Sequence, residues 1–481
     1  MSSRSVEISQ KDNYSGNFGH AYRSSAIFYY KQSESFKTTV SFMDYWKPKR
    51  NVKVYILVSI RHMDGSLLER KEYRFEDGNV INFSELADKE FEGSVEVEVF
   101  AAQNMVIPYS AIMVIYENEN SISMTHSYGR VYSPHEIEEG KTIMIGEESC
   151  WTVRDTDSIK SFAVFHNGTG PQLAQTLKLE VLNHKNEAKT FDYNIDELKP
   201  YASVRLVPQD IIGSELVDFL EGKAGNISVS FDLNGGFTRM LVGNESSSET
   251  QITHSNFNYS KHKTDDAGEG IAHMQIPPAG FKESEVIIYP HCSPADYILK
   301  QDGEVVTNFK SGERVAHSIE DGLLTFETSN GILPSRIVTA LSAKPAKDNV
   351  KLPYEVSLGI IHKNRPLKST HWGVIATDTN KYESRIFVVA LESVYGKNPD
   401  TSLTVNIYLE STKEVISRTL TAEELARADQ GLYISYLFPE LKDKNPGDFG
   451  WYYFRSETYG GFMVYSTIEN EKGSLTLEHS F

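Results

Sequence analysis

Short segments in which hydrophobic and polar residues alternate occur along the whole chain. Residues 92–100 read E-G-S-V-E-V-E-V-F, and residues 403–409 read L-T-V-N-I-Y-L. A period of two is typical of a strand with one buried face, and Gly, Asn and Asp residues mark turns between such strands. The chain is therefore predicted to consist mainly of β-strands.

Helical patterns are few and short. Residues 211–220 (I-I-G-S-E-L-V-D-F-L) and 421–428 (T-A-E-E-L-A-R-A) have helical spacing, and we expect Thr421 to cap the second of these helices. Neither segment is long enough to form the helical layer of an α/β protein. The helices are expected to connect strands rather than to cover a sheet.

The strand pattern recurs four times. Apolar opening strands are predicted at residues 38–44, 160–166, 284–291 and 384–392, and about 90 residues after the start of each a closing segment ends in histidine. Each closing segment has an apolar run, an Asn, and then a His seven to ten residues later. Asn favours turns, so each is predicted to be a hairpin whose second strand ends in His. The Asn residues are Asn118, Asn244, Asn364 and Asn470, and the His residues are His126, His254, His371 and His479.

The four copies predict an all-β fold, a tandem array of four antiparallel β-sandwich domains of immunoglobulin-like size with a few short helices. The predicted domains are residues 36–130, 145–260, 270–372 and 373–481. Residues 1–35 are predicted to be an extension with one strand. That strand would either complete the first domain or dock on another copy of the chain.

The charge balance excludes some partners. The chain of 481 residues has 66 acidic and 48 basic side chains, which gives a formal net charge of -18 at pH 7. Because nucleic-acid binding depends on neutralising phosphates, no nucleic-acid partner is expected. No run of about 18 apolar residues predicts a membrane span, and no signal-peptide pattern is present, so the cytoplasm is the expected compartment. Cys150 and Cys292 are too few to predict a disulfide framework or a cysteine zinc site.

The closing histidines have two interpretations. Each imidazole either forms a hydrogen bond that fixes a joint between domains, or it binds a divalent metal with a residue at the end of the opening strand. The second interpretation assumes that opening and closing strands run side by side. It pairs His126, His254, His371 and His479 with Asp44, His166, His291 and Glu392, respectively.

Two aromatic strings are candidate ligand-binding surfaces. Residues 43–50 (M-D-Y-W-K-P-K-R) include Trp46, and residues 451–455 (W-Y-Y-F-R) include Trp451, Tyr453 and Arg455. Tyr and Trp combine a large contact area with a polar edge, as sugar and protein partners require. The alternative is that these side chains pack in the core or between domains.

No sequence motif of a known catalytic site is present, so enzyme activity is not the favoured hypothesis. The sequence predicts a non-enzymatic binding or structural protein for a glycan or a protein partner, with homo-oligomerisation through edge strands. One alternative is a metal-dependent enzyme whose site lies between domains and uses the repeated histidines. Another is a component of a virion or a surface layer.

Overall fold

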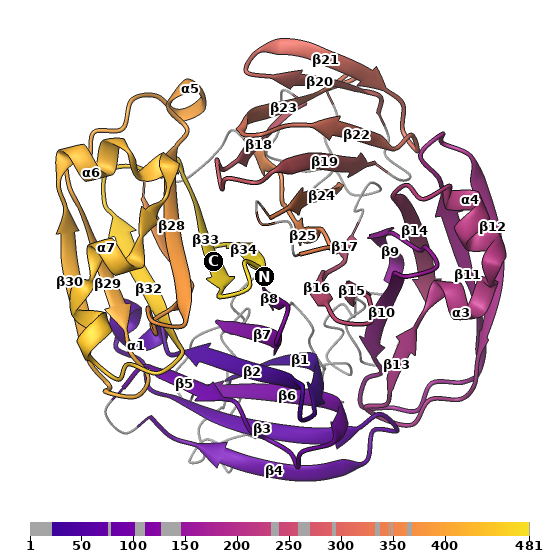
Figure 1. Ribbon diagram of the computed structural model, residues 1–481, viewed down its shortest axis with the longest axis horizontal. Coiled ribbons are helices and arrows are strands. Elements are labelled where there is room, and N and C mark those ends of the chain that lie inside the picture. The colour runs from indigo at the N-terminus through magenta and orange to yellow at the C-terminus, as the bar shows by residue number, and fades with distance from the viewer. Residues whose placement is uncertain are drawn as a thin grey trace, which may run out of the picture.

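The computed structural model describes residues 22–75, 78–101, 111–126, 146–231, 240–257, 270–290, 295–331, 337–345, 347, 350–362 and 368–480. Within these ranges the strands form eight antiparallel sheets, in four successive pairs along the chain. Each pair forms a sandwich, and the four sandwiches lie around a common centre (Figure 1). The predicted all-β fold is confirmed.

The first sandwich comprises residues 22–126. Its elements are β1 (Tyr22–Gln32), β2 (Phe36–Met43), α1 (Trp46–Arg50), β3 (Val54–His62), β4 (Leu67–Tyr73), β5 (Val80–Phe83), β6 (Phe91–Ala101), β7 (Ile112–Asn118) and β8 (Ile122–His126). One sheet has the strand order β1-β6-β3-β4, and the other has β5-β2-β7-β8. The N-terminal strand β1 pairs with β6 along its whole length, so it completes this sandwich.

The second sandwich comprises residues 146–257. Its elements are β9 (Gly146–Val153), β10 (Lys160–His166), β11 (Gln175–Leu182), β12 (Ala188–Ile195), β13 (Ser203–Leu206), α3 (Pro208–Ile212), α4 (Ser214–Leu220), β14 (Gly225–Phe231), β15 (Leu241–Glu245), β16 (Thr250–His254) and β17 (Asn256–Phe257). The helices α3 and α4 occupy the segment with the first predicted helical pattern. The sheets have the orders β12-β11-β14-β9-β17 and β13-β10-β15-β16.

The third sandwich comprises residues 270–362. Its strands are β18 (Ile271–Ile276), β19 (Glu283–Tyr289), β20 (Tyr297–Gln301), β21 (Glu304–Phe309), β22 (Val315–Ser318), β23 (Gly322–Thr328), β24 (Val338–Lys344), β25 (Tyr354–Ser357) and β26 (Ile361–His362). The sheets have the orders β21-β20-β23-β18-β26 and β22-β19-β24-β25.

The fourth sandwich comprises residues 368–480. Its elements are β27 (Ser369–Ala376), β28 (Tyr382–Ala390), α5 (Glu392–Tyr395), β29 (Leu403–Tyr408), β30 (Val415–Leu420), α6 (Ala422–Ala426), the 3-10 helix η2 (Ala428–Gln430), β31 (Leu432–Tyr433), α7 (Ile434–Leu437), the 3-10 helix η3 (Pro439–Asp443), β32 (Phe449–Ser456), β33 (Phe462–Asn470) and β34 (Leu475–His479). The sheets have the orders β27-β32-β29-β30 and β31-β28-β33-β34. Thr421 caps α6 as predicted, because its hydroxyl accepts the Glu424 N–H at 3.2 Å while the Glu424 carboxylate accepts the Thr421 N–H at 2.9 Å.

Three of the predicted closing hairpins are present. β7 pairs with β8, β15 with β16, and β33 with β34. Their second strands end at His126, His254 and His479. In each case the closing strand lies at the edge of the sheet that faces the centre of the ring (Figure 1).

The predicted closing strand of the third repeat is wrong. His371 lies in β27, the first strand of the fourth sandwich, which pairs with β32 from Ser369 to Ala376. The strand that closes the third sandwich is β25, and residues 354–358 read Y-E-V-S-L, without a histidine. The domain boundary predicted between residues 372 and 373 falls within β27, and Asn364 lies outside the described residues.

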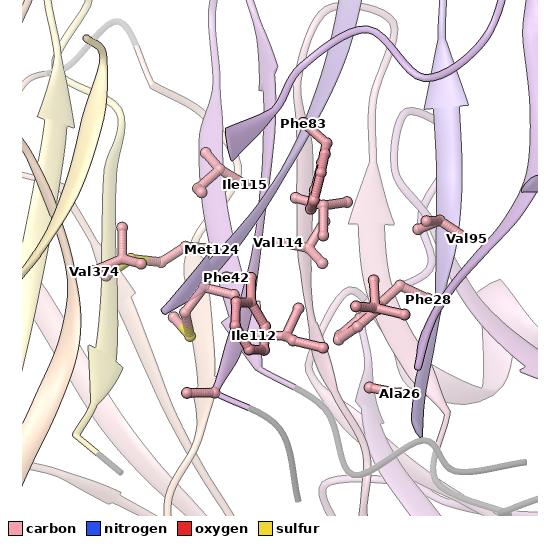
Figure 2. Packing of buried hydrophobic residues seen from close by; sticks show 14 of the residues in the cluster. Ala26, Phe28, Phe42, Phe83, Val95, Ile112, Val114, Ile115, Met124 and Val374 are labelled. Atoms are coloured by element: carbon pink, nitrogen blue, oxygen red, sulfur yellow. The ribbon is translucent and has the colours of Figure 1, made fainter. Parts of the chain in front are cut away.

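The sandwich interiors contain the apolar residues of the alternating pattern. In the first sandwich, Phe28 and Val95 from one sheet face Phe42 and Val114 from the other (Figure 2). The same cluster continues beyond the sandwich, because it includes Val374 of the fourth sandwich. Burial of these side chains stabilises each unit by about 1.5–3 kcal/mol per large residue.

Contacts between consecutive sandwiches, and between the last and the first, close the ring. Apolar clusters join the first sandwich to the second and fourth, the second to the third, and the third to the fourth. At the joint between the fourth and first sandwiches, the indole N–H of Trp451 donates to Ser41 Oγ at 2.8 Å, and Tyr45 stacks on Trp372 with centroids 4.5 Å apart. The central site is therefore held by a closed ring rather than by an open string of domains.

Candidate functional site

The four closing strands meet at the centre of the ring. β8 contacts β16 and β34, and β25 contacts the same two strands, so that the four strands form a closed circuit. Each is the edge strand of its sheet and presents backbone groups that no further strand in that sheet pairs. We call this meeting of β8, β16, β25 and β34 the hub.

Side-chain oxygens bind the edge N–H groups at the hub. The N–H groups of Ile122 and Met124 in the first sandwich donate to Ser474 Oγ and Thr476 Oγ1 in the fourth, at 3.0 and 2.9 Å. In the same way, the N–H of Ile252 in the second sandwich donates to Ser123 Oγ in the first at 3.1 Å. Hydroxyl groups thus replace a strand ladder between sandwiches.

Replacement of Ser123 by alanine should therefore destabilise the hub. The Ile252 N–H is buried and would lose its acceptor, which costs about 1–3 kcal/mol. Urea unfolding of the Ser123→Ala variant measures the change, and Ser158→Ala in an exposed turn is the control, expected within about 0.5 kcal/mol of wild type. Equal stability of the two variants would contradict this role of Ser123.

Three histidines and one glutamate converge at one end of the hub. Donor atoms of His126, His254, Glu478 and His479 all lie within 4.8 Å of one another. The His126 ring lies edge-on to the rings of His254 and His479, with centroids 4.8 and 4.5 Å apart. Glu478 Oε1 lies 3.3 Å from His126 Nδ1 and 3.6 Å from His479 Nε2. We call these four residues the hub cluster.

The hub cluster is almost completely shielded from solvent. His126, His254 and Glu478 are 3%, 2% and 1% exposed, and only the His479 side chain, at 29%, reaches solvent. Two of the rings contact a backbone carbonyl oxygen. His254 Nδ1 lies 3.0 Å from Ser255 O, and His479 Nδ1 lies 3.0 Å from Ser480 O. Such contacts fix the orientation of the ring and direct Nε2 away from the backbone.

The donor set suits a transition metal. Three imidazole nitrogens and one carboxylate oxygen are ligands that zinc accepts in a tetrahedron at about 2.0–2.2 Å, which places the donors roughly 3.5 Å apart. The donors need small rotations to contract from their present spacing of up to 4.8 Å. A hydrogen-bonded histidine cluster without metal is the alternative use of the same groups.

Among the described residues, the third sandwich contributes no histidine to the hub cluster. In the other three sandwiches, a buried apolar residue lies two positions before the closing histidine: Met124, Ile252 and Leu477. The corresponding residue in β25 of the third sandwich is Val356. The residue two positions after Val356 is Leu358, which is 3% exposed. An apolar side chain thus occupies the fourth position, and the carboxylate of Glu478 supplies the remaining donor.

Sequence reasoning missed Glu478. The signal was present in the triplet L-E-H at residues 477–479, because the other closing strands have Thr125, Thr253 and Ser357 at the corresponding position. A lone carboxylate among hydroxyl residues marks a departure from the repeat. Its role as a metal donor depends on the meeting of β8, β16 and β34, which the sequence does not show.

His371 lies apart from the hub cluster. Its Nδ1 is 2.8 Å from Ser480 Oγ, and its ring lies 5.1 Å from that of Phe454. His371 and Ser480 both belong to the fourth sandwich, so this contact fixes two segments of one domain and not a joint between domains. His371 is therefore a useful control for the residues of the hub cluster.

The assumed pairing of opening and closing strands is wrong. In the first, second and fourth sandwiches β7, β15 and β33 lie between the opening and closing strands, so Asp44, His166 and Glu392 are not strand neighbours of the histidines assigned to them. Glu392 begins α5 instead of ending a strand. His291 lies outside the described residues.

Asp44 is a buried carboxylate that belongs to no group of three or more metal donors among the described residues. It is 2% exposed and accepts the Lys47 N–H at 3.2 Å. Burial raises the pKa of Asp44 to about 7, although the hydrogen bond opposes this effect. Since the folded state holds this proton more tightly than the unfolded chain does, stability falls as the pH rises from about 4 to about 7.

Replacement of Asp44 by asparagine should stabilise the protein at pH 8. The variant keeps an acceptor for Lys47 and avoids the buried charge, for an expected gain of about 1–3 kcal/mol at pH 8 and a smaller one at pH 5. Urea unfolding at the two pH values measures this. Asp64→Asn is the opposite control, because hydrogen bonds from Ser66 lower the pKa of Asp64 to about 2 and its removal should not stabilise. No gain in Asp44→Asn at pH 8 would contradict the prediction.

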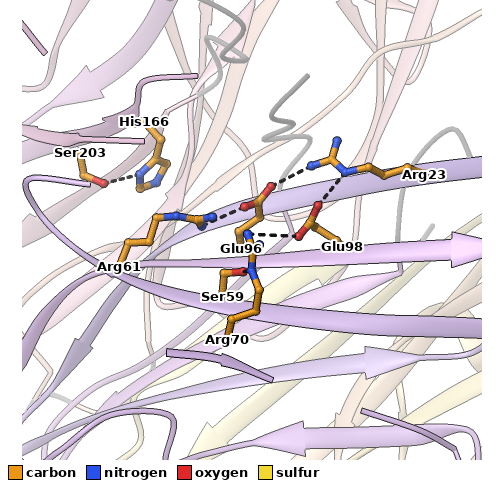
Figure 3. Close-up of polar contacts among 8 residues, drawn as sticks. All are labelled: Arg23, Ser59, Arg61, Arg70, Glu96, Glu98, His166 and Ser203. Carbon is orange, nitrogen blue, oxygen red and sulfur yellow. Dashed lines mark hydrogen bonds and ion pairs between the residues drawn. The ribbon is translucent and has the colours of Figure 1, made fainter. Parts of the chain in front are cut away.

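His166 lies at the joint between the first and second sandwiches. Its Nδ1 is 2.7 Å from Ser203 Oγ, and burial lowers the pKa of His166 to about 3, so the ring is neutral. Nearby, Arg61 and Arg23 bind opposite oxygens of Glu96 at 2.9 and 3.0 Å (Figure 3). The joint thus contains a buried ion network.

The aromatic strings do not form an exposed platform. Trp46, Trp451 and Tyr453 are 5%, 0% and 8% exposed, and all three belong to the apolar cluster shared by the first and fourth sandwiches. Arg455 is the exposed member and pairs with Glu457 at 2.6 Å. The alternative interpretation, packing between domains, describes these aromatic residues.

Comparison with known proteins assigns no family. No protein-family model matches the chain, and a search of curated proteins finds no significant similarity. In the part of the chain that the structure describes, every helix is too short or too polar to cross a membrane.

Proposed function

We propose that the protein is a non-enzymatic structural or binding protein, made of four copies of one β-sandwich unit and held in a ring by a divalent metal ion at the hub. The observation that carries the proposal is the convergence of His126, His254, Glu478 and His479 from three separate sandwiches. A metal bound by all four residues would cross-link residues more than 120 positions apart in the chain. Zinc is the ion that best fits three imidazoles and a carboxylate.

A structural role for the ion is favoured over a catalytic one by the number of protein donors and their burial. Structural zinc sites take four protein ligands, whereas catalytic sites keep one position for water or substrate. The hub cluster offers four donors, three of them from residues at most 3% exposed. Such a site leaves little room for a substrate.

The common strand order supports the proposal of four copies. In every sandwich the first, sixth, third and fourth strands form one sheet, and the fifth, second, seventh and eighth form the other. The fourth strands β4, β12, β21 and β30 each end a sheet on the outside of the ring. These edges are where a partner protein or a second copy would add a strand.

Metal analysis of protein purified without an affinity tag tests the proposal. We expect about one zinc ion per chain, in keeping with a single four-donor site. Protein that remains metal-free after dialysis against zinc, with the fold intact by circular dichroism, would contradict it.

A second candidate is a metal-dependent enzyme, favoured by the partial exposure of His479 at 29%. Cobalt substitution separates the two functions, because the visible spectrum of Co²⁺ reports its ligands. If the site is closed, addition of azide or cyanide leaves the spectrum unchanged. A shifted spectrum would instead indicate an open coordination position and favour the enzyme.

A further inference from the structure

A polar cavity of about 590 Å³ lies at the joint between the second and third sandwiches. Its lining includes Arg154, His184 and Lys223 from the second sandwich and Glu285, Arg314 and Lys344 from the third. The volume lies within the range of small-ligand sites, about 300–1,000 Å³. The apolar contact at this joint is small, since its cluster consists of Cys150, Leu182, Tyr289 and Val338.

Arg314 is a buried lining residue whose side chain uses only part of its hydrogen-bonding capacity. It is 7% exposed, and its Nε donates to Asn226 Oδ1 at 2.9 Å. Its backbone N–H donates to Asn186 Oδ1 at 2.6 Å, so two residues of the second sandwich hold it in place. Among the described residues, no hydrogen-bond or ion-pair partner contacts its two terminal nitrogens.

The charged guanidinium of Arg314 is buried without a carboxylate of the described residues bound to it, so its desolvation is not compensated by a direct ion pair. Desolvation lowers the pKa of Arg314 to about 10, and the nearby charge of Arg154 acts in the same direction. The carboxylates of Glu285 and Glu355 oppose the shift from a distance. An anion in the cavity would relieve the desolvation of Arg314.

The carboxylates that line the cavity are already occupied. Of the lining carboxylates, Glu285 binds Arg154 at 3.1 Å and Glu283 binds Lys344 at 2.6 Å. Arg154 also binds Glu355, which is not part of the lining, at 2.6 Å. Lys223 is exposed, and none of the described residues forms an ion pair with it. The groups left without a charged partner are thus both cations, Arg314 and Lys223.

We propose that this cavity binds a small ligand through an oxyanion, a phosphate, sulfate or carboxylate group, which Arg314 would contact with its terminal nitrogens and Lys223 would contact from the rim. Guanidinium groups recognise such oxyanions through two parallel hydrogen bonds, and a lysine adds a point charge. The lining is polar and contains no Phe, Tyr or Trp among the described residues, which favours a compact hydrophilic molecule, such as an acidic sugar or a sugar phosphate. The ligand would join the second and third sandwiches, which the hub cluster does not.

Isothermal titration calorimetry with inorganic phosphate, sulfate, glucuronate and neutral glucose tests the proposal at constant ionic strength. We expect at least one anion to bind and glucose not to bind. The Arg314→Gln variant should weaken binding by about tenfold or more, and Lys223→Gln by a few-fold. Arg455→Gln, a surface arginine of the fourth sandwich, is the matched control and should bind like wild type.

Lys223→Gln keeps the test decisive if Arg314→Gln does not fold, because Lys223 is exposed and its loss should leave the fold intact. Binding that is equal in wild type and in Lys223→Gln and Arg314→Gln would show that the anion binds elsewhere. Absence of binding by all three anions, or equal binding of glucose, would also overturn the proposal.

Discussion

Removal of metal by a chelator should lower the free energy of unfolding by several kcal/mol. A ligand that binds only the folded state stabilises it by about 4 kcal/mol when its free concentration is about 1,000 times its Kd. The metal at the hub would be such a ligand, because His126, His254 and His479 come together only in the closed ring. Urea unfolding with zinc and with chelator measures the difference.

Two single variants show whether this stabilisation arises at the hub cluster. His254→Ala removes the donor from the second sandwich and should lose most of the zinc-dependent stability. His371→Ala removes a buried histidine that contacts Ser480 and should lose some stability but keep the full response to zinc. A wild-type protein that is insensitive to the chelator, or equal zinc responses in both variants, would contradict a metal at the hub.

Replacement of Arg61 by methionine should destabilise the protein by about 3 kcal/mol. Arg61 and Glu96 are 3% and 1% exposed and lie 2.9 Å apart, so loss of the cation leaves a buried carboxylate with Arg23 as its remaining cationic partner among the described residues. Burial already raises the pKa of Glu96, and the two arginines oppose that shift. The Arg61 guanidinium also lies 4.0 Å from the ring of Tyr201 in the second sandwich, so its loss weakens the joint.

The double variant Arg61→Met, Glu96→Gln separates charge from packing. Removal of both charges should recover much of the lost stability, since a buried ion pair contributes little beyond neutral side chains of similar size. Arg74→Met breaks the exposed pair of Arg74 with Glu72 and should leave stability close to that of the wild type. If Arg61→Met costs no more than Arg74→Met, the network does not stabilise the joint.

The all-β fold was predictable because its signal is local. Segments such as residues 92–100 and 403–409 alternate with a period of two, and both lie in strands, β6 and β29. The cap of α6 was predictable for the same reason, since Thr421 and Glu424 are three residues apart. Both patterns can be recognised within a short segment of sequence, without knowledge of contacts between distant residues.

The convergence at the hub was only partly predictable. The recurrence of His126, His254 and His479 after an Asn turn identified three of the four donors. It did not reveal that they contact one another, because the closure of the ring depends on contacts between the first and fourth sandwiches. For the same reason, the burial of Trp451 was not predictable. Trp451 packs against the first sandwich and donates a hydrogen bond to Ser41, 410 residues earlier in the chain.

The error at His371 has a specific cause. The third closing strand ends at residue 357, with Leu358 in place of the histidine, and His371 in β27, the first strand of the fourth sandwich, stood near the expected position. Without knowledge of strand pairing, His371 was taken as the repeat's last residue because it follows Asn364 by seven positions. The cavity at Arg314 was missed because its residues come from seven separated segments with no shared spacing.

Anomalous diffraction at the zinc absorption edge would locate the metal itself. Crystals grown with zinc should show one strong anomalous peak bonded to His126, His254 and His479, with Glu478 as the fourth ligand. A map without a peak there, with the three rings bound only to one another and to the carboxylate, would show that the ring closes without a metal.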